Sequence, residues 1–221
     1  MTLLLREERG AIVEYGKRLV SHGLTRGTGG NVSVLNREKG LFAVSPSGMD
    51  YFETRPEDVV VLDLEGNVVD GARRPSSEAA MHRLIYQDRV DAGAVVHTHS
   101  PFATALSCTR EGQENGIPPV HYLAALAGSG GGVPCVPYHP FGTMELARAA
   151  CVGMRGRFAV LLGNHGLLAA GPDIARAFNV AEELEFVCEL YARARTMGTP
   201  ALLTEDDMRD AGERFSGYGQ R

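Results

Sequence analysis

The chain has 221 residues, of which 44% are hydrophobic and 22% are charged, and its formal net charge is -5. These values exclude a nucleic-acid-binding surface and a membrane span, because the basic residues are scattered and no apolar run approaches the ~20 residues that cross a bilayer. Residues 1–14 also lack the pattern of a signal peptide, so we expect one cytoplasmic domain over 1–221 that binds neither nucleic acid nor membranes.

The first half of the chain reads as a helix followed by paired strands. Apolar residues recur at helical spacing over 5–19, and Gly23 ends that helix. Four short runs of strand-forming residues lie between turn-forming residues, at 31–34, 41–44, 59–64 and 68–69. They predict an antiparallel meander. Ser77 then caps a further helix that has Glu78 in its first turn.

In the second half, strands alternate with helices. Apolar runs predict strands at 92–99, 133–138 and 159–162. Helical spacing predicts helices at 146–151 and 173–195, and 120–122 begins another helix or turn. Together these elements predict an α/β fold, a single domain in which a central, mainly antiparallel sheet is flanked by helices.

Three histidines form a candidate metal site. His97 and His99 lie two residues apart at the end of a predicted strand, so their side chains point to the same face and can hold one ion together. Hydrogen-bonded core or surface imidazoles explain an isolated H-x-H pair equally well. His165 favours the metal interpretation, because it follows a second apolar strand and can reach the same sheet edge. Three imidazoles leave one coordination position open, as in catalytic zinc sites, although other divalent ions also bind imidazole.

Glu78 and His82 share one face of the helix predicted after Ser77. A carboxylate at a helix N-terminus is favourable in itself, but beside a metal Glu78 can alternate between ligand and base. His82, four residues further on, is a competing ligand. We expect a structural role for His82, because the three histidines above already supply three nitrogens.

Seven short motifs follow one another over 23–218, and their order and spacing are specific although each alone is weak. They are Gly27-Thr28-Gly29-Gly30-Asn31-Val32-Ser33, Ser45-Pro46-Ser47-Gly48, Pro75-Ser76-Ser77-Glu78, His97-Thr98-His99, Pro119-Val120-His121-Tyr122, Phe141-Gly142-Thr143 and Asn164-His165-Gly166-Leu167. On these motifs the chain resembles the class II aldolase and adducin-head family, and within it the L-fuculose-1-phosphate aldolases. The resemblance implies the three-layer fold of that family.

The resemblance also implies a site. It implies one zinc ion per subunit held by His97, His99 and His165, with Glu78 as a displaceable fourth ligand that then exchanges the substrate proton. The family's phosphate-binding positions correspond to Thr28, Asn31, Ser47, Gly48, Ser76 and Ser77. This phosphate pocket has no lysine or arginine, but hydroxyls, glycine-rich turns and backbone N–H groups at a helix start bind phosphate as well.

Two tyrosines complete the implied catalytic set. Tyr122 matches a tyrosine that relatives supply from a neighbouring subunit to move a proton at the breaking bond, which implies a homotetramer. Tyr218 matches a tyrosine on a C-terminal tail, here 205–221, that moves to cover the site. By themselves, a tyrosine beside an apolar run packs in a core and an exposed tail frays.

The implied activity is reversible cleavage of L-fuculose 1-phosphate, or a similar deoxyketose 1-phosphate, to dihydroxyacetone phosphate and a short aldehyde such as L-lactaldehyde. Alternatives are a methylthioribulose-1-phosphate dehydratase, a pentulose-phosphate 4-epimerase and a non-catalytic adducin-head-like binding module. The epimerases have aspartate at the position of Glu78, and retention of Glu78 with all three histidines argues against the binding module. The sequence departs from the closest pattern at 110–116 and 128–132, which flank the aldehyde end of the pocket.

Overall fold

One sheet organises the chain, for which a computed structural model describes residues 3–128 and 131–217. Over these residues eight strands pair in the order β4-β3-β2-β1-β5-β8-β7-β6. The strands are β1 (Asn31–Asn36), β2 (Leu41–Val44), β3 (Val60–Asp63), β4 (Val68–Asp70), β5 (Ala94–Thr98), β6 (Cys135–Val136), β7 (Ala159–Leu162) and β8 (Gly166–Gly171). All neighbouring pairs are antiparallel except β6 and β7. The predicted mainly antiparallel sheet is confirmed.

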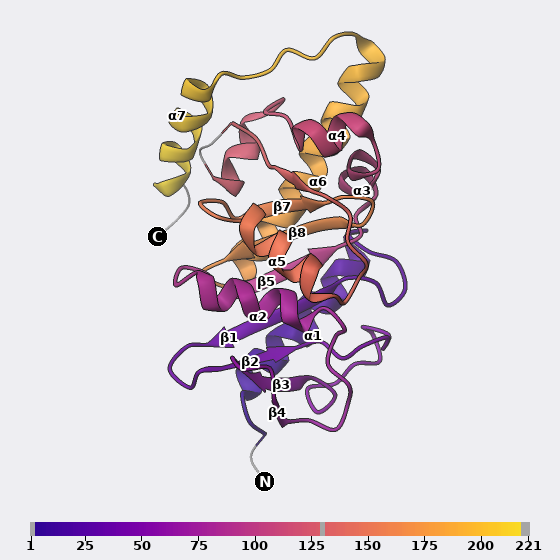
Figure 1. Ribbon diagram of the computed structural model, residues 1–221, viewed down its shortest axis with the longest axis vertical. Coiled ribbons are helices and arrows are strands. Elements are labelled where there is room, and N and C mark those ends of the chain that lie inside the picture. Colours follow the sequence, from indigo (N-terminus) through magenta and orange to yellow (C-terminus); the bar gives the residue numbers. More distant parts are fainter. Residues whose placement is uncertain (1–2, 129–130, 218–221) are drawn as a thin grey trace.

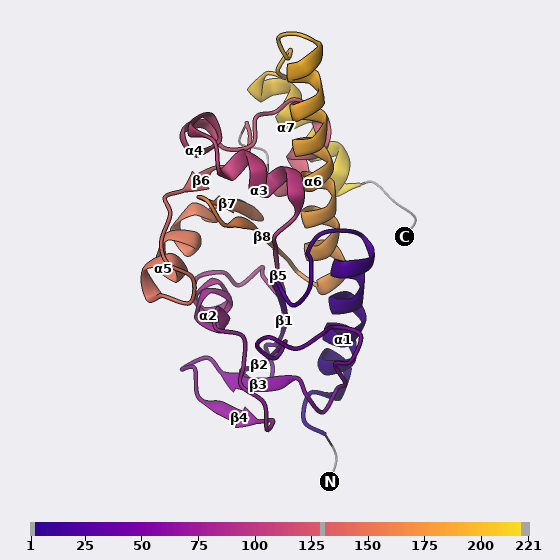
Figure 2. The same ribbon diagram turned by 90° about the vertical axis from the view of Figure 1, so that its right-hand side faces the viewer.

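Helices cover both faces of the sheet (Figures 1 and 2). The helical elements are α1 (Arg6–Ser21), α2 (Ala79–Asp88), α3 (Pro101–Ser107), α4 (Arg110–Asn115), the 3-10 helix η1 (Tyr122–Ala127), α5 (Met144–Gly153), α6 (Ile174–Met197) and α7 (Glu205–Ser216). Figure 2 shows α2 and α5 on one side of the sheet and α1 and α6 on the other. The predicted α/β fold with a three-layer arrangement is therefore confirmed.

Alternation along the strands assigns each side chain to one of two cores. On β5, Val96 packs into the core shared with α1 and α6, whereas Val95 packs into the core shared with α2 and α5. Because alternate residues of a strand point to the same face, His97 follows Val95 onto the α2 side. On β1, Val32 belongs to the core shared with α1, so Asn31 and Ser33 on either side of it face α2.

Some predicted elements differ from those in the structure. The strand expected over 133–138 is reduced to β6, whereas the helix or turn expected to begin at 120–122 is η1, which begins at Tyr122. The N-cap of α2 is Glu78 rather than Ser77, and it makes no side-chain capping bond. Strand β8 was not predicted, because its sequence, GLLAAG, is rich in glycine and alanine, which have low strand propensity. Pairing with β5 and β7 on either side supplies what local propensity lacks.

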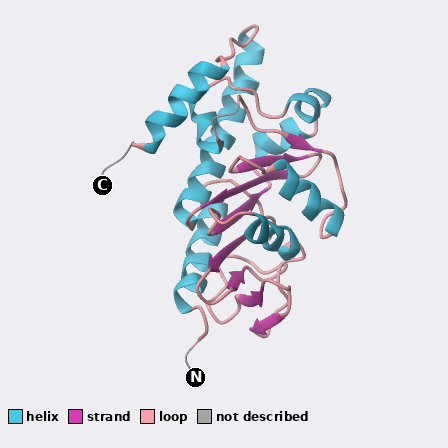
Figure 3. Cartoon of the chain, turned by 60° about the vertical axis from the view of Figure 1, so that its left-hand side comes forward, coloured by secondary structure: helices cyan, strands magenta, loops and turns pink. Residues whose placement is uncertain are grey.

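The C-terminal segment predicted as a tail forms α7 over Glu205–Ser216, at one end of the molecule (Figure 3). A capping box between Thr204 and Asp207 begins this helix, and Met208 and Ala211 are buried in the α6 core. Tyr218 lies outside the described residues. Among the helices described, none is long and apolar enough to cross a membrane.

Candidate active site

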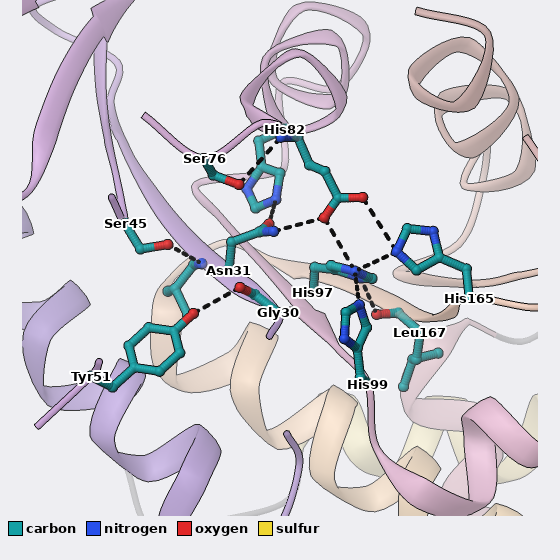
Figure 4. A network of polar contacts seen from close by, with 12 residues as sticks. Gly30, Asn31, Ser45, Tyr51, Ser76, His82, His97, His99, His165 and Leu167 are labelled. Carbon is teal, nitrogen blue, oxygen red and sulfur yellow. Dashed lines mark hydrogen bonds and ion pairs between the residues drawn. The ribbon is translucent and has the colours of Figure 1, made fainter. Parts of the chain in front are cut away.

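Three imidazole nitrogens converge where the central strand β5 ends and its neighbour β8 begins (Figure 4). His97 lies on β5, His99 follows that strand, and His165 immediately precedes β8. His97 Nε2 is 3.0 Å from His99 Nε2 and 3.2 Å from His165 Nε2. One nitrogen from each ring lies within 4.8 Å of the other two. The structure thus brings together the three histidines that the sequence separates.

Hydrogen bonding and burial set the state of these rings. His97 Nδ1 lies 3.0 Å from the carbonyl oxygen of Leu167. Since a carbonyl oxygen only accepts, Nδ1 carries the proton and Nε2 of the neutral ring keeps its lone pair. Burial lowers the pKa of His97 to about 3 and also lowers the pKa of His99. Both rings are therefore neutral at pH 7, and each has a nitrogen lone pair that can bind a metal ion.

Glu78 lies over this histidine cluster. Its Oε2 is 3.4 Å from His97 Nε2, and its Oε1 is 3.3 Å from His165 Nε2. Asn31 Nδ2 donates a hydrogen bond of 2.9 Å to Oε2, whereas Oε1 is buried without a hydrogen-bond partner among the described residues. Burial opposes ionisation, but the pKa of Glu78 is nevertheless lowered, with the hydrogen bond donated by Asn31 among the causes. Glu78 is therefore a carboxylate with one uncommitted oxygen.

The geometry fits a divalent cation. His97 Nε2 has one lone pair, which cannot accept from the Nε2 atoms of both His99 and His165, 3.0 Å and 3.2 Å away, whereas a single cation can bind all three nitrogens. Two nitrogens that each lie 2.0–2.1 Å from one tetrahedral zinc ion are about 3.3 Å apart, close to the separations at His97. The unpartnered Oε1 of Glu78 adds an anionic oxygen beside these nitrogens. His97, His99 and His165 can therefore hold a metal, with Glu78 in reach as a fourth ligand.

A cavity of about 440 Å³ opens beside the cluster, and Glu78, His99 and His165 are part of its wall. All six positions that the resemblance assigns to phosphate also line it: Thr28, Asn31, Ser47, Gly48, Ser76 and Ser77. None of the described lining residues is lysine or arginine. Hydroxyls, an amide and backbone N–H groups are thus the donors that this wall offers to an anion.

Gly30 allows the turn Gly27-Thr28-Gly29-Gly30 to lie close against β5, the strand that contains His97. Its φ of +68° lies in the left-handed region, and a Cβ built there would lie 2.6 Å from the carbonyl oxygen of His97. Tyr51 donates a hydrogen bond of 2.8 Å to the carbonyl of Gly30 (Figure 4). Only glycine fits this approach without displacing β5, so the turn and the histidine cluster are fixed relative to each other.

The lining residues that were not predicted as site residues include Tyr138, Phe141 and Asn164. Tyr138 and Phe141 are 58% and 73% exposed and add aromatic surface to the cavity wall. Asn164 adopts a φ of 52°, and its Oδ1 accepts a 2.7 Å hydrogen bond from Gln113 of α4. Phe141 and Asn164 stood in the motifs that carried the resemblance, whereas no sequence signal marked Tyr138.

Tyr122 is not among the residues that line this cavity. It begins η1, is 51% exposed, and stacks on Phe215 of α7 with ring centroids 5.9 Å apart. There it lines a second cavity, of about 720 Å³, with residues of α6 and α7. Within one chain, Tyr122 and the histidine cluster are therefore in different places.

Comparison with known proteins identifies the family. The sequence profile described as the Class II Aldolase and Adducin N-terminal domain matches residues 10–192. The chain belongs to this family. A 5-deoxy-D-ribulose 1-phosphate aldolase of Bacillus thuringiensis is 52% identical over 99% of this chain and 100% of its own length. A 5-methylthioribulose-1-phosphate/5-deoxyribulose-1-phosphate aldolase of Rhodospirillum rubrum is 39% identical over 96% of this chain and 92% of its own.

A solved structure of an L-fuculose 1-phosphate aldolase superposes with a TM-score of 0.89 at 44% identity, covering 95% of this chain and 96% of the other. The class II aldolase and adducin domain therefore accounts for nearly the whole chain, and the predicted family is confirmed.

Proposed function

We propose that this protein is a divalent-metal-dependent aldolase that cleaves a deoxyketose 1-phosphate to dihydroxyacetone phosphate and a short aldehyde. The observation that carries the proposal is the convergence of His97, His99, His165 and the uncommitted oxygen of Glu78 on one point of a polar cavity. A binding module has no need of three converging imidazoles and a buried carboxylate, an arrangement that is costly to bury without a cation.

Zinc is the metal we propose, one per subunit, held by the three histidines with Glu78 as a displaceable fourth ligand. When bound, the ion supplies a Lewis acid that stabilises negative charge developing on the substrate oxygens. A site of three imidazoles is typical of catalytic zinc and leaves a position for substrate. The hydrogen bond from His97 Nδ1 to Leu167 orients the first ligand, as such outer contacts do in metal sites.

Glu78 is the residue we propose for proton transfer at carbon. Its Oε2 is held by Asn31, while Oε1 has no hydrogen-bond partner among the described residues and lies 3.3 Å from His165 Nε2. Cleavage between C3 and C4 of a ketose 1-phosphate requires removal of the proton from the C4 hydroxyl and delivery of a proton to C3. We assign the first transfer to Tyr122, which passes the hydroxyl proton on to solvent, and the second to Glu78, which takes up a proton from solvent at Oε1, gives it to C3 and is again a carboxylate.

Because Tyr122 lies outside the cavity of its own chain, this assignment requires a second subunit. We propose a homotetramer in which Tyr122 reaches the site of a neighbour and Tyr218 covers it. The half-exposed Tyr122 ring, stacked on Phe215 at the end of the molecule, supports that arrangement.

The phosphate group is proposed to bind Thr28, Asn31, Ser47, Gly48, Ser76 and Ser77. These residues share the cavity wall with Glu78, so a sugar phosphate bound to them would have its phosphorylated end and its reacting carbon in one cavity. Thr28, Ser47 and Ser77 are exposed and so present hydroxyls without first breaking buried contacts. Neutral donors of this kind can bind a phosphate dianion through several hydrogen bonds at once.

For the substrate we propose 5-deoxy-D-ribulose 1-phosphate ahead of L-fuculose 1-phosphate. The first would yield acetaldehyde and the second L-lactaldehyde, with dihydroxyacetone phosphate in both cases. The 52% identity to a 5-deoxy-D-ribulose 1-phosphate aldolase supports the shorter sugar. The exposed rings of Tyr138 and Phe141 on the cavity wall suit an apolar methyl terminus in either case.

The test measures dihydroxyacetone phosphate released from both sugars, with and without a chelator, by the wild type and by Glu78→Gln. Chelator-sensitive release that zinc restores, with release by Glu78→Gln reduced about 100- to 10,000-fold, supports the proposal. Metal binding without triose phosphate would favour the dehydratase or epimerase, which product analysis separates. Absence of metal binding would leave the adducin-like binding module.

A further inference from the structure

A continuous chain of buried hydrogen bonds runs from Glu78 into the core between β1 and α2. Asn31 Nδ2 donates to Glu78 Oε2 at 2.9 Å, and Asn31 Oδ1 lies 2.5 Å from His82 Nε2. His82 Nδ1 lies 2.6 Å from Ser33 Oγ, which lies 2.6 Å from the hydroxyl of Tyr86. His82 and Ser33 are fully buried, and the other three residues are at most 7% exposed.

The two elements present these residues in register. Glu78, His82 and Tyr86 are spaced four apart, so they lie along one face of α2. Asn31 and Ser33 are spaced two apart, so they lie on one face of β1, the face toward α2. Side chains from the helix and the strand therefore alternate along the chain, and Figure 4 shows the contacts of His82 and Asn31 at its active-site end.

The carboxylate fixes the direction of every bond in the chain. Glu78 Oε2 accepts, so the amide nitrogen of Asn31 must face it and Oδ1 must face His82. Oδ1 only accepts, so His82 carries its proton on Nε2 and leaves Nδ1 as an acceptor. Ser33 then donates to Nδ1 and accepts from Tyr86. A neutral His82 with the proton on Nε2 satisfies all four bonds at once.

The same chain sets which oxygen of Glu78 is committed. Asn31 donates to Oε2 and leaves Oε1 without a hydrogen-bond partner among the described residues, 3.3 Å from His165 Nε2. If the Asn31 amide turned over, its oxygen would face Oε2 and the two acceptors would repel. His82 prevents that turn, because its Nε2–H requires an oxygen opposite it.

We propose that His82 is a positioning residue that, through Asn31, holds Glu78 with Oε1 free for proton transfer. This inference rests on the proposed role of Glu78. His82 touches neither the cavity nor the histidine cluster, since it is absent from the described residues around both. Ser33 and Tyr86 keep the His82 ring in the required tautomer, so they help to position Glu78 as well. Asn31 has a second N–H for a substrate, because it also lines the cavity.

The test compares His82→Gln with His82→Met in the zinc-loaded full-length protein. Glutamine and methionine have the same length, but only the glutamine amide can donate to Asn31 Oδ1. We expect His82→Met to lower kcat about 10- to 100-fold with unchanged KM and one zinc per chain, and His82→Gln to recover most of kcat. Ile85→Val, in the core on the same helix, serves as a control that lowers stability but leaves kcat unchanged.

Equal kcat losses in His82→Gln and His82→Met, or a loss that tracks zinc content or thermal stability as in Ile85→Val, would overturn the proposal. The tautomer provides a readout that needs no substrate. In 15N-labelled wild-type protein, the imidazole spectrum should show His82 protonated on Nε2 alone, and protonation on Nδ1 instead would refute the chain. If the wild type cleaves no ketose phosphate, the proposed function fails, while this spectrum still tests the bonding of His82 separately.

Discussion

Substitution of Gly30 by alanine tests how closely the glycine turn supports the histidine strand. Gly30 has a φ of +68°, and an added Cβ would lie 2.6 Å from the carbonyl oxygen of His97. An L-residue in the left-handed region costs roughly 1–2 kcal/mol. Overpacking against β5, a central strand that cannot yield easily, costs about 1–3 kcal/mol more. The expected loss in the free energy of unfolding is therefore roughly 2–5 kcal/mol.

Gly27→Ala is the matched control. Gly27 stands in the same turn with a φ of +60°, but a Cβ there would meet no described atom within 4 Å. The free energy of unfolding of Gly27→Ala should fall only by the cost of an L-residue in the left-handed region, about 1–2 kcal/mol. The reduced entropy of the unfolded chain is the same for both alanines and cancels from the comparison. The difference between the two variants, about 1–3 kcal/mol, thus isolates the close approach to His97.

Urea unfolding of both metal-free variants measures these losses, and zinc titration of each reports the histidine site. A domain with a stability of about 10 kcal/mol, the middle of the usual range of about 5–15 kcal/mol, remains folded in both cases. Gly30→Ala should also bind zinc more weakly, because relief of the contact displaces the backbone of His97. Equal unfolding free energies and equal zinc affinities in Gly27→Ala and Gly30→Ala would refute the reasoning.

Three further outcomes are expected. His99→Ala should weaken zinc binding by at least about tenfold in a competition titration while the fold is retained, and undiminished affinity would remove His99 from the site. Tyr122→Phe should lower kcat about 100- to 10,000-fold without changing zinc content, and co-assembly with inactive Glu78→Gln subunits should restore activity only if Tyr122 acts across an interface. In the metal-free protein, acid should unfold the chain through His82 and His97, whose pKa values burial lowers to about 4 and about 3. Their folded forms stay neutral while the unfolded chain binds protons below about pH 6.5, so the free energy of unfolding should fall by about 1.4 kcal/mol per pH unit for each histidine down to about pH 4. His82→Gln should reduce that slope by about 1.4 kcal/mol per pH unit, and a slope unaltered by this variant would contradict the assignment.

The sequence could indicate the three histidines, which could hold a metal, and Glu78 as a candidate site, because their chemistry is local. His97 and His99 are two apart on a strand, and that spacing alone places both rings on one face. The strongly periodic helices α1 and α6 were also predictable, since apolar spacing that extends over several turns leaves little ambiguity. The motifs around these residues were sufficient to indicate the family, which the match over residues 10–192 confirms.

Other features depend on partners far along the chain. Strand β8 has weak propensity and forms because β5 and β7 lie on both sides of it. The position of Tyr122 away from the cavity of its own chain follows from the packing of η1 against α7, which no local pattern predicts.

His82 shows most clearly which features the sequence indicates and which features only the tertiary structure decides. Its spacing from Glu78 suggested only a shared helical face, on which it was either a ligand or a structural residue. The register of β1 against β5, which pairs Asn31 with His97, and the packing of α2 over β1 place an amide between His82 and Glu78. The sequence by itself determined which groups can bind a metal and carry a proton. Only the tertiary structure decided which oxygen of Glu78 is free, because the hydrogen bonds that orient a buried carboxylate come from residues on another element.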